Sequence, residues 1–267
     1  MILAVDIGNT RTTLALFTLE GRPVFLSELE TDRRMTRDQC AIRILGVFQL
    51  YQARVEQVSG AILSSVVPPA TQPYAQAIRR LTGQLPLLVG PGLKTGLNIR
   101  ADVHNELGSD MVASAVAAVE RYPMPAIVIN SHTAVSFSYV SQSAFEGCSI
   151  MPGMGIALEA LSQNGAQLPQ ISMGRVDSPL GRNTVDAMRA GIVYGYAGAF
   201  DRLIFTMEQA AGAPAATVVA TGEHLPEIFR HCQREITYDH DLLVHGLYLL
   251  YRKNAPKGRI RWSARPT

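Results

Sequence analysis

The sequence predicts an α/β protein built from two similar domains that face each other across a central cleft. Two segments carry this prediction, residues 1–18 and residues 126–139, because each consists of an apolar strand, a short polar turn and a second strand. Each segment is followed by helical patterns, which indicates an internally duplicated α/β unit. We expect a nucleotide to bind between the two turns. The length of 267 residues, with 47% hydrophobic and 17% charged residues, is ample for two globular cores.

The first turn, residues 6–10, has the composition of a phosphate-binding hairpin. Gly8 lets the backbone approach an anion closely, and Asn9 and Thr10 supply side-chain donors. Asp6, at the end of the first strand, can hold a magnesium ion through a carboxylate oxygen or through water. An ordinary hairpin with a capping aspartate explains the same residues, so this short motif alone leaves both interpretations open.

The second turn repeats this layout with different residues. Asn130 stands where Asp6 stands in the first turn, His132 stands where Gly8 stands, and Thr133 lies near the position of Thr10. This correspondence strengthens the prediction of a duplicated unit.

Together with the two strands of the first hairpin, the elements of the first half form a β-β-β-α-β-α-β series. The helix predicted near residues 36–55 rests on recurring apolar residues, Ile42, Leu45, Phe48 and Leu50. A helix at 106–121 leads through a Tyr-Pro-Met-Pro segment into the second half, and there we place the domain boundary. The other predicted elements are strands at 23–31, 60–68 and 85–91 and a helix at 71–82.

The second half is predicted to hold a strand at 147–155, a helix leading into a loop at 156–169, a long glycine-bearing helix at 181–212, a strand at 217–225 and a closing helix at 241–252. So many glycines weaken an isolated helix, so the long helix is expected to pack tightly on another helix or on a partner subunit. The predicted domains are residues 1–121 and residues 122–254. A basic tail at 255–267 is expected to be disordered, since undocked chain ends usually are.

Composition and charge exclude several classes of function. A net charge of +2 argues against extended binding of a nucleic-acid backbone. No apolar stretch is long enough to cross a bilayer, and the chain starts with a strand and no targeting signal, so we expect a cytoplasmic protein. Three cysteines without a C-x-x-C pair indicate neither a disulfide framework nor a zinc site.

A series of motifs across nearly the whole chain resembles the type III pantothenate kinases in both order and spacing. The motifs are DIGNT at 6–10, LGSD at 107–110, the hairpin at 126–137, IMPG at 150–153, LP at 168–169, GRNT at 181–184, the helix around Gly191–Gly195, ATG at 220–222 and HGLYLLYRKN at 245–254. The resemblance implies a duplicated ribonuclease-H-like fold of the actin, Hsp70 and sugar-kinase superfamily, and a homodimer.

The resemblance also implies ATP-dependent phosphorylation of the primary hydroxyl of pantothenate to 4'-phosphopantothenate, the first step of coenzyme A synthesis. Asp6 would position Mg²⁺ on the phosphates of ATP, and Asp110 would be the catalytic base. The residues implied to bind ATP and its phosphates are Asp6, Gly8, Asn9, Thr10, Thr133 and Gly222, and those implied to bind pantothenate are Gly108, Ser109, Asp110 and Thr184.

Three of these assignments have simpler structural alternatives. Asp110 can be a first-turn acid that the helix dipole favours. Thr184, which in the family reaches the pantothenate site of the partner subunit, can be a helix cap, as can Asn183. Gly222, on the nucleoside side of the family's site, can be a plain turn between strand and helix.

The chain departs from the family pattern around the implied substrates. Met111 replaces an arginine, and Ala101, Val103 and His104 replace residues that line the pantothenate pocket. Asn130 replaces the aspartate that holds a monovalent cation such as K⁺ or NH₄⁺, and His132, Cys148 and Glu223 replace glycines. We hypothesise that His132 takes the place of the cation beside the phosphates; a packed or surface histidine is the alternative. Glu223 could repel phosphate or accept a hydrogen bond from adenosine. A non-catalytic or altered-substrate paralogue that binds a nucleotide or a protein partner is the alternative function.

Overall fold

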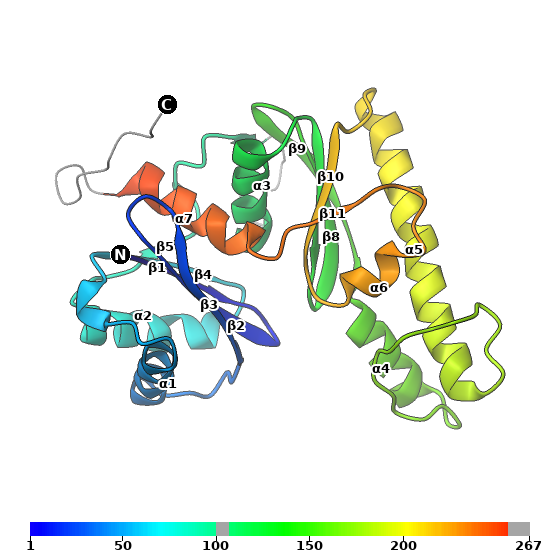
Figure 1. Ribbon diagram of the computed structural model, residues 1–267, viewed down its shortest axis with the longest axis horizontal. Coiled ribbons are helices and arrows are strands. Elements are labelled where there is room, and N and C mark those ends of the chain that lie inside the picture. Colours follow the sequence, from blue (N-terminus) through cyan, green and yellow to red (C-terminus); the bar gives the residue numbers. More distant parts are fainter. Residues whose placement is uncertain (100–106, 256–267) are drawn as a thin grey trace. The chain divides into compact units, whose positions relative to one another are not determined.

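The computed structural model describes residues 1–99 and 107–255, and its backbone divides into two compact units (Figure 1). Unit 1 comprises Met1–Leu97, the described residues up to Ala117, and the C-terminal segment from Asp241. Unit 2 runs from Ala118 to His240 and adds the short strand β6 (Asn98–Ile99).

Unit 1 is built on a five-stranded sheet with the order β3-β2-β1-β4-β5. The first three strands form an antiparallel meander, and β4 and β5 continue the sheet in parallel. The strands are β1 (Ile2–Ile7), β2 (Arg11–Phe17), β3 (Pro23–Glu30), β4 (Gly60–Ser65) and β5 (Leu87–Leu88). The register pairs Asp6 of β1 with Ser64 of β4, which places both side chains at the same end of the sheet.

The central strand β1 is buried on both faces. Leu3, Val5 and Ile7 belong to the core formed with α1 (Arg37–Leu50) and α2 (Pro68–Thr82), whereas Ile2 and Ala4 belong to the core formed with α7 (Leu242–Asn254). A strand covered on both faces is apolar throughout, as this one is apart from its acidic end.

The structure corrects the domain to which the last helix was assigned. Helix α7 was predicted to belong to the domain at 122–254, but it packs on β1 and β4 of unit 1. A side chain at Gly246 would collide with the backbone of Ala113, so α7 lies directly against α3 (Ser109–Arg121). The division between the units falls within α3, after Ala117, and not at the loop at 122–125.

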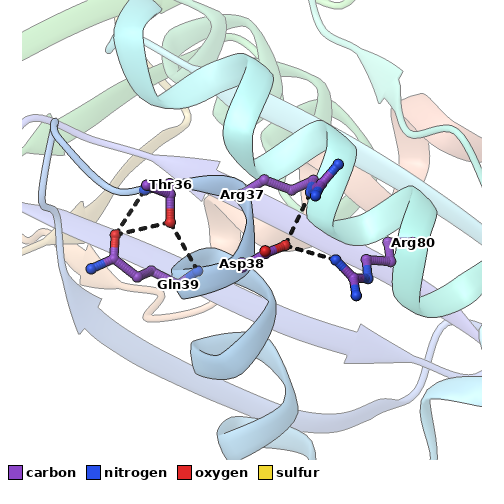
Figure 2. A network of polar contacts seen from close by, with 5 residues as sticks. All are labelled: Thr36, Arg37, Asp38, Gln39 and Arg80. Carbon is purple, nitrogen blue, oxygen red and sulfur yellow. Dashed lines mark hydrogen bonds and ion pairs between the residues drawn. The ribbon is translucent and has the colours of Figure 1, made fainter.

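The first turn of α1 is fixed by two sets of polar contacts (Figure 2). Thr36 and Gln39 form a capping box, in which each side chain accepts a hydrogen bond from the other residue's backbone N–H. Asp38 accepts hydrogen bonds from Arg37 Nε at 3.1 Å and from Arg80 Nη1 of α2 at 2.8 Å. These contacts tie the start of α1 to the end of α2.

Helix α1 ends earlier than predicted and buries a different face. It stops at Leu50, and a short 3₁₀ turn, η1 (Val55–Gln57), follows. Of the apolar residues in the predicted pattern, Phe48 is buried, but Ile42, Leu45 and Leu50 are exposed. The core-facing side includes Cys40, Ala41, Ile44 and Val47 instead.

Unit 2 repeats the strand order of unit 1, which confirms the predicted duplication. Its sheet has the order β11-β10-β7-β8-β9-β6, in which β7, β8 and β9 form an antiparallel meander and β10 and β11 follow in parallel to β7. Strand β6 extends the far edge. The strands are β7 (Ala126–Ser131), β8 (Ala134–Val140), β9 (Ala144–Pro152), β10 (Thr217–Gly222) and β11 (Thr237–Tyr238).

Three helices complete unit 2, namely α4 (Met154–Asn164), α5 (Thr184–Ala211) and α6 (Leu225–Phe229). Phe137 of β8 meets Phe200 of α5 edge to face, with ring centroids 4.9 Å apart, at the centre of this core. Gly212, in the left-handed conformation, ends α5. None of the helices in the described part of the chain combines the length and apolar character needed to span a membrane.

Candidate active site

The buried carboxyl of Asp6 is held by a short chain of hydroxyl groups in unit 1. Asp6 is 8% exposed, and its Oδ1 accepts a hydrogen bond from Ser64 Oγ at 2.6 Å. Ser64 Oγ lies 2.8 Å from Ser109 Oγ, on the first residue of α3. The chain Asp6, Ser64 and Ser109 therefore connects the end of β1 to the start of the helix that carries Asp110.

Burial raises the pKa of Asp6 to about 7. Loss of hydration is the main cause, the hydrogen bond from Ser64 opposes it, and the nearby carboxylate of Asp110 adds to the rise. A carboxyl group with such a pKa changes its charge near neutral pH, and a bound cation would favour the ionised form.

Asp110 lies in the first turn of α3, and Gly108 provides the space for its side chain. A Cβ atom at position 108 would collide with Asp110 Oδ1, so glycine at this position leaves the Asp110 carboxylate free to lie over the backbone without moving. The structure thus joins Asp6 and Ser109 through Ser64, and Asp110 is the residue that follows Ser109 in the first turn of α3.

The turn after β1 presents its polar residues to solvent. Gly8 N donates to Arg11 O at 2.9 Å, and a Cβ at Gly8 would lie 3.0 Å from that oxygen, which leaves little room for a side chain. Asn9 and Thr10 are exposed.

Arg33 contacts this turn from another part of the chain, and no sequence pattern predicted it. Its Nη2 donates to Asn9 Oδ1 at 2.9 Å from the loop between β3 and α1. No motif marks Arg33, because a contact between positions this far apart depends on how the loop folds back.

The corresponding turn of unit 2 surrounds a buried amide. Asn130 is 1% exposed, and among the residues that the structure describes neither Oδ1 nor Nδ2 has a hydrogen-bond partner. His132 is exposed and Thr133 is half-buried. The backbone oxygen of Thr133 accepts from Gly153 N at 2.9 Å, where a side chain on Gly153 would collide with the turn.

Gly222 is the last residue of β10 and is paired with Ser131 at the end of β7. Its φ is +110°, and a Cβ atom there would collide with Ser131 O, so this position requires glycine. Glu223 N donates to Ser131 O at 2.7 Å, and Ser131 Oγ donates to Glu223 O at 2.9 Å. The Glu223 carboxylate lies 3.8 Å from His224 Nε2.

Thr184 is the first residue of α5 and is exposed. The cap is Asn183, whose side chain accepts from Asp186 N at 2.9 Å. The structure thus decides between the two candidates for the cap and leaves the Thr184 hydroxyl outside that role.

Comparison with known proteins connects this geometry to a family. The family model for type III pantothenate kinase matches residues 2–206. The chain belongs to this family. A type III pantothenate kinase from an Exiguobacterium species is 36% identical over 255 residues, covering 95% of this chain and 99% of the relative. Another from Listeria monocytogenes is 37% identical over 257 residues, covering 96% and 98%.

Solved structures confirm the predicted fold class of this type III pantothenate kinase family member. The activator of the 2-hydroxyisocaproyl-CoA dehydratase from Clostridium difficile, solved with bound ADPNP, matches with a TM-score of 0.55 and 10% identity and covers 99% of each chain. The similar structures have actin-like ATPase and sugar-kinase folds.

The described residues of this family member hold no group of three or more histidine, cysteine or acidic side chains that could enclose a metal. Mg²⁺ fits a site with few protein ligands, because it is usually bound by one or two carboxylates together with substrate phosphates. Asp6 is suited to this role, since a cation would supply the counter-charge that its burial lacks. Asn130 does not fit the charged cation site that the family pattern implies, because its amide is neutral.

The departures from the family pattern divide into those that the structure describes and those that it does not. Met111, in place of arginine, is 5% exposed and packs inside unit 1. Cys148 is exposed and forms no disulfide. Ala101, Val103 and His104 lie outside the described residues, as does the basic tail from residue 256 onward.

Proposed function

We propose that this protein transfers the γ-phosphoryl group of ATP to the primary hydroxyl of pantothenate, giving 4'-phosphopantothenate at the start of coenzyme A biosynthesis. The observation that carries this proposal is the hydroxyl chain from Asp6 through Ser64 to Ser109, which links the end of β1 to the first turn of α3, where Asp110 lies. Family membership supports pantothenate as the acceptor. We also propose that the reaction takes place in the cytoplasm.

In this proposal, Gly8, Asn9 and Thr10 bind phosphate oxygens of ATP, and the family pattern implies Thr133 as a further donor. Gly222 leaves room for the adenosine. Positioning and charge neutralisation provide most of the catalysis in phosphoryl transfer. Mg²⁺ would supply positive charge to the β- and γ-phosphates, and Asp6 is the residue that would hold it.

Asp110 acts as the general base, with Gly108 and Ser109 shaping the acceptor side. Its carboxylate accepts the hydroxyl proton of pantothenate as the hydroxyl oxygen attacks the γ-phosphorus, and ADP departs with the electrons of the broken P–O bond. Asp110 lies in the first turn of α3, where the helix dipole is favourable to an acidic residue.

Acceptor-dependent formation of ADP tests the proposal. The purified protein is incubated with Mg·ATP and, in separate reactions, with pantothenate, with other small primary alcohols and with no acceptor. We expect ADP to form with pantothenate well above the rate without acceptor. If ADP forms only with a different alcohol, that alcohol and not pantothenate is the acceptor. If no acceptor leads to ADP formation, the protein binds a nucleotide or a partner without catalysing transfer.

We predict that turnover does not depend on a monovalent cation. Asn130 lacks the negative charge that would bind K⁺ or NH₄⁺, and His132 lies in the adjacent turn on the exposed surface. Wild-type rates measured in sodium and potassium buffers of equal ionic strength should agree within about twofold. His132→Gly should raise the KM for ATP roughly tenfold, because a hydrogen-bond donor to phosphate is lost. Strong stimulation by potassium would contradict this prediction.

We also propose a homodimer formed through α5. Thr184, Ala187, Gly191, Gly195 and Gly198 recur at intervals of three or four and are all exposed, so they lie along one face of the helix. Within the described chain, nothing lies within 4 Å of the point where a Cβ atom would stand at Gly191, Gly195 or Gly198. Such a face allows a second helix to approach closely, and it would bring Thr184 to the partner's pantothenate site.

A leucine on this face is predicted to disrupt the dimer. Gly195→Leu would fill the contact with a branched side chain, while the open surroundings of Gly195 within this chain leave the monomer fold unaffected. Sedimentation velocity should show a dimer for the wild type and a shift of at least tenfold in the dissociation constant for the variant. Gly46→Leu on α1, which is also unobstructed, is the matched control. A monomeric wild type would contradict the proposal.

A further inference from the structure

The loop between β3 and α1 is fixed at both ends. At its start, Thr31 N donates to Thr10 O at 2.9 Å, and the hydroxyls of Thr31 and Thr12 lie 2.8 Å apart. At its end, the capping box of Thr36 and Gln39 anchors the chain to α1 (Figure 2). Between these points Arg34 N donates to Asp32 Oδ1, and Met35 is buried. The loop therefore presents Arg33 to the turn at 8–10 from a rigid support.

The contact of Arg33 with Asn9 determines which way the Asn9 amide faces. A guanidinium group has donors and no acceptor, so it can hydrogen-bond only to the amide oxygen of Asn9. The NH₂ group of the same amide then points away from Arg33 and is available as a donor. A phosphate oxygen accepts hydrogen bonds, so this orientation is the one that suits an anionic ligand at the turn.

Arg33 also adds positive charge beside the turn. The guanidinium is exposed, and within the described chain no carboxylate lies within ion-pair distance of it. Arg11, the other arginine next to this turn, already pairs with Glu28 of β3 at 2.5 Å. The charge of Arg33 is therefore the less compensated of the two.

We propose that Arg33 is a positioning residue for the polyphosphate of a bound nucleotide. It fixes the Asn9 amide with its NH₂ group toward the phosphates, and the charge of the guanidinium strengthens the hydrogen bond that holds the amide in this orientation. The inference rests on the proposed binding of ATP at this turn, and it concerns nucleotide affinity and not the choice of acceptor.

Calorimetric titration with the non-hydrolysable analogue Mg·AMP-PNP tests this role on the full chain. We expect Arg33→Ala to raise the dissociation constant roughly tenfold, in line with loss of a charged hydrogen bond. Arg33→Lys should recover most of the lost affinity. Asn9→Ala should weaken binding similarly. Because Arg33 acts through Asn9, the double variant should be no more than about threefold weaker than either single variant.

Arg34→Ala is the matched control, because it removes an exposed arginine from the neighbouring position and should change the affinity by less than twofold. Thermal melting should be the same for all of these variants, and the KM for pantothenate should not change. An affinity of Arg33→Ala equal to that of Arg34→Ala would overturn the inference, as would additive losses in the double variant. If the wild-type protein binds AMP-PNP but does not phosphorylate pantothenate, the proposed function is wrong and the role of Arg33 still stands. If it does not bind AMP-PNP, both the proposed function and the role of Arg33 are wrong.

Discussion

Asp110→Asn is expected to lower the rate of phosphate transfer to pantothenate by 100- to 10,000-fold, the usual contribution of a general base. Asparagine has nearly the same size, so it fits above Gly108, but it cannot accept the hydroxyl proton. The affinity for Mg·AMP-PNP should change by less than about threefold. Steady-state rates and calorimetry on the same preparations measure the two effects separately.

The control for this variant is Asp38→Asn. Asp38 is also an aspartate in the first turn of a helix, but it is exposed and pairs with Arg37 and Arg80 (Figure 2). If Asp110 only complemented the helix dipole, both variants would lose a fraction of a kcal/mol in stability and transfer would continue. Transfer by Asp110→Asn within tenfold of the wild-type rate would exclude the catalytic role.

Asp6→Asn is expected to stabilise the ligand-free protein at pH 8 while weakening nucleotide binding. The pKa of Asp6 is about 7 in the folded protein, against an ordinary value of 3.8, so folding favours the protonated form. The stability that this group contributes is complete below pH 4 and is lost as the pH rises through 7. At pH 8 the buried carboxylate lowers the free energy of unfolding by up to about 4 kcal/mol, and a neutral asparagine does not.

Urea unfolding at pH 5 and pH 8 tests whether Asp6→Asn raises or lowers the free energy of unfolding. Asp6→Asn should gain stability relative to wild type at pH 8 and gain much less at pH 5. The same variant should bind Mg·AMP-PNP at least tenfold more weakly, because it offers no charge to the metal. A variant less stable than wild type at pH 8 would show that the Asp6 carboxylate is well compensated in the fold.

Asp239→Asn serves as the contrasting control. Asp239 is equally buried, but Arg121 Nη1 donates to it at 2.9 Å and Tyr122 Oη at 2.7 Å. Removing this charge should destabilise the protein by roughly 1 to 3 kcal/mol at both pH values, since the arginine loses a charged partner. The opposite signs of the two substitutions would separate an uncompensated buried acid from a paired one.

The sheet architecture could be predicted because strand patterns are local. Continuous apolar residues in β1 and β7, each ending in a polar turn, were sufficient to locate both meanders and the duplication. Helix α7 was assigned to the wrong domain because an apolar face shows that a helix is buried but not which sheet it covers. Likewise, the periodicity of Ile42 and Leu45 could not show that α1 turns its smaller residues toward the core.

The candidate site was only partly predictable for a related reason. Asp6 and Asp110 each lie in a recognisable motif, but the hydroxyls of Ser64 and Ser109 that join them come from separate elements and carry no local signal. Arg33 reaches Asn9 from a loop, and the Asp110 carboxylate occupies the space that a side chain at Gly108 would need. Such contacts depend on the folded arrangement and not on sequence spacing.

Direct identification of the product is the most decisive measurement. The wild-type protein is incubated with pantothenate and ATP carrying an isotopic label in the γ-phosphate, with magnesium present, and the products are separated and identified by mass spectrometry. We expect labelled 4'-phosphopantothenate in amounts equal to the ADP released. Folded protein that leaves pantothenate unlabelled would contradict it.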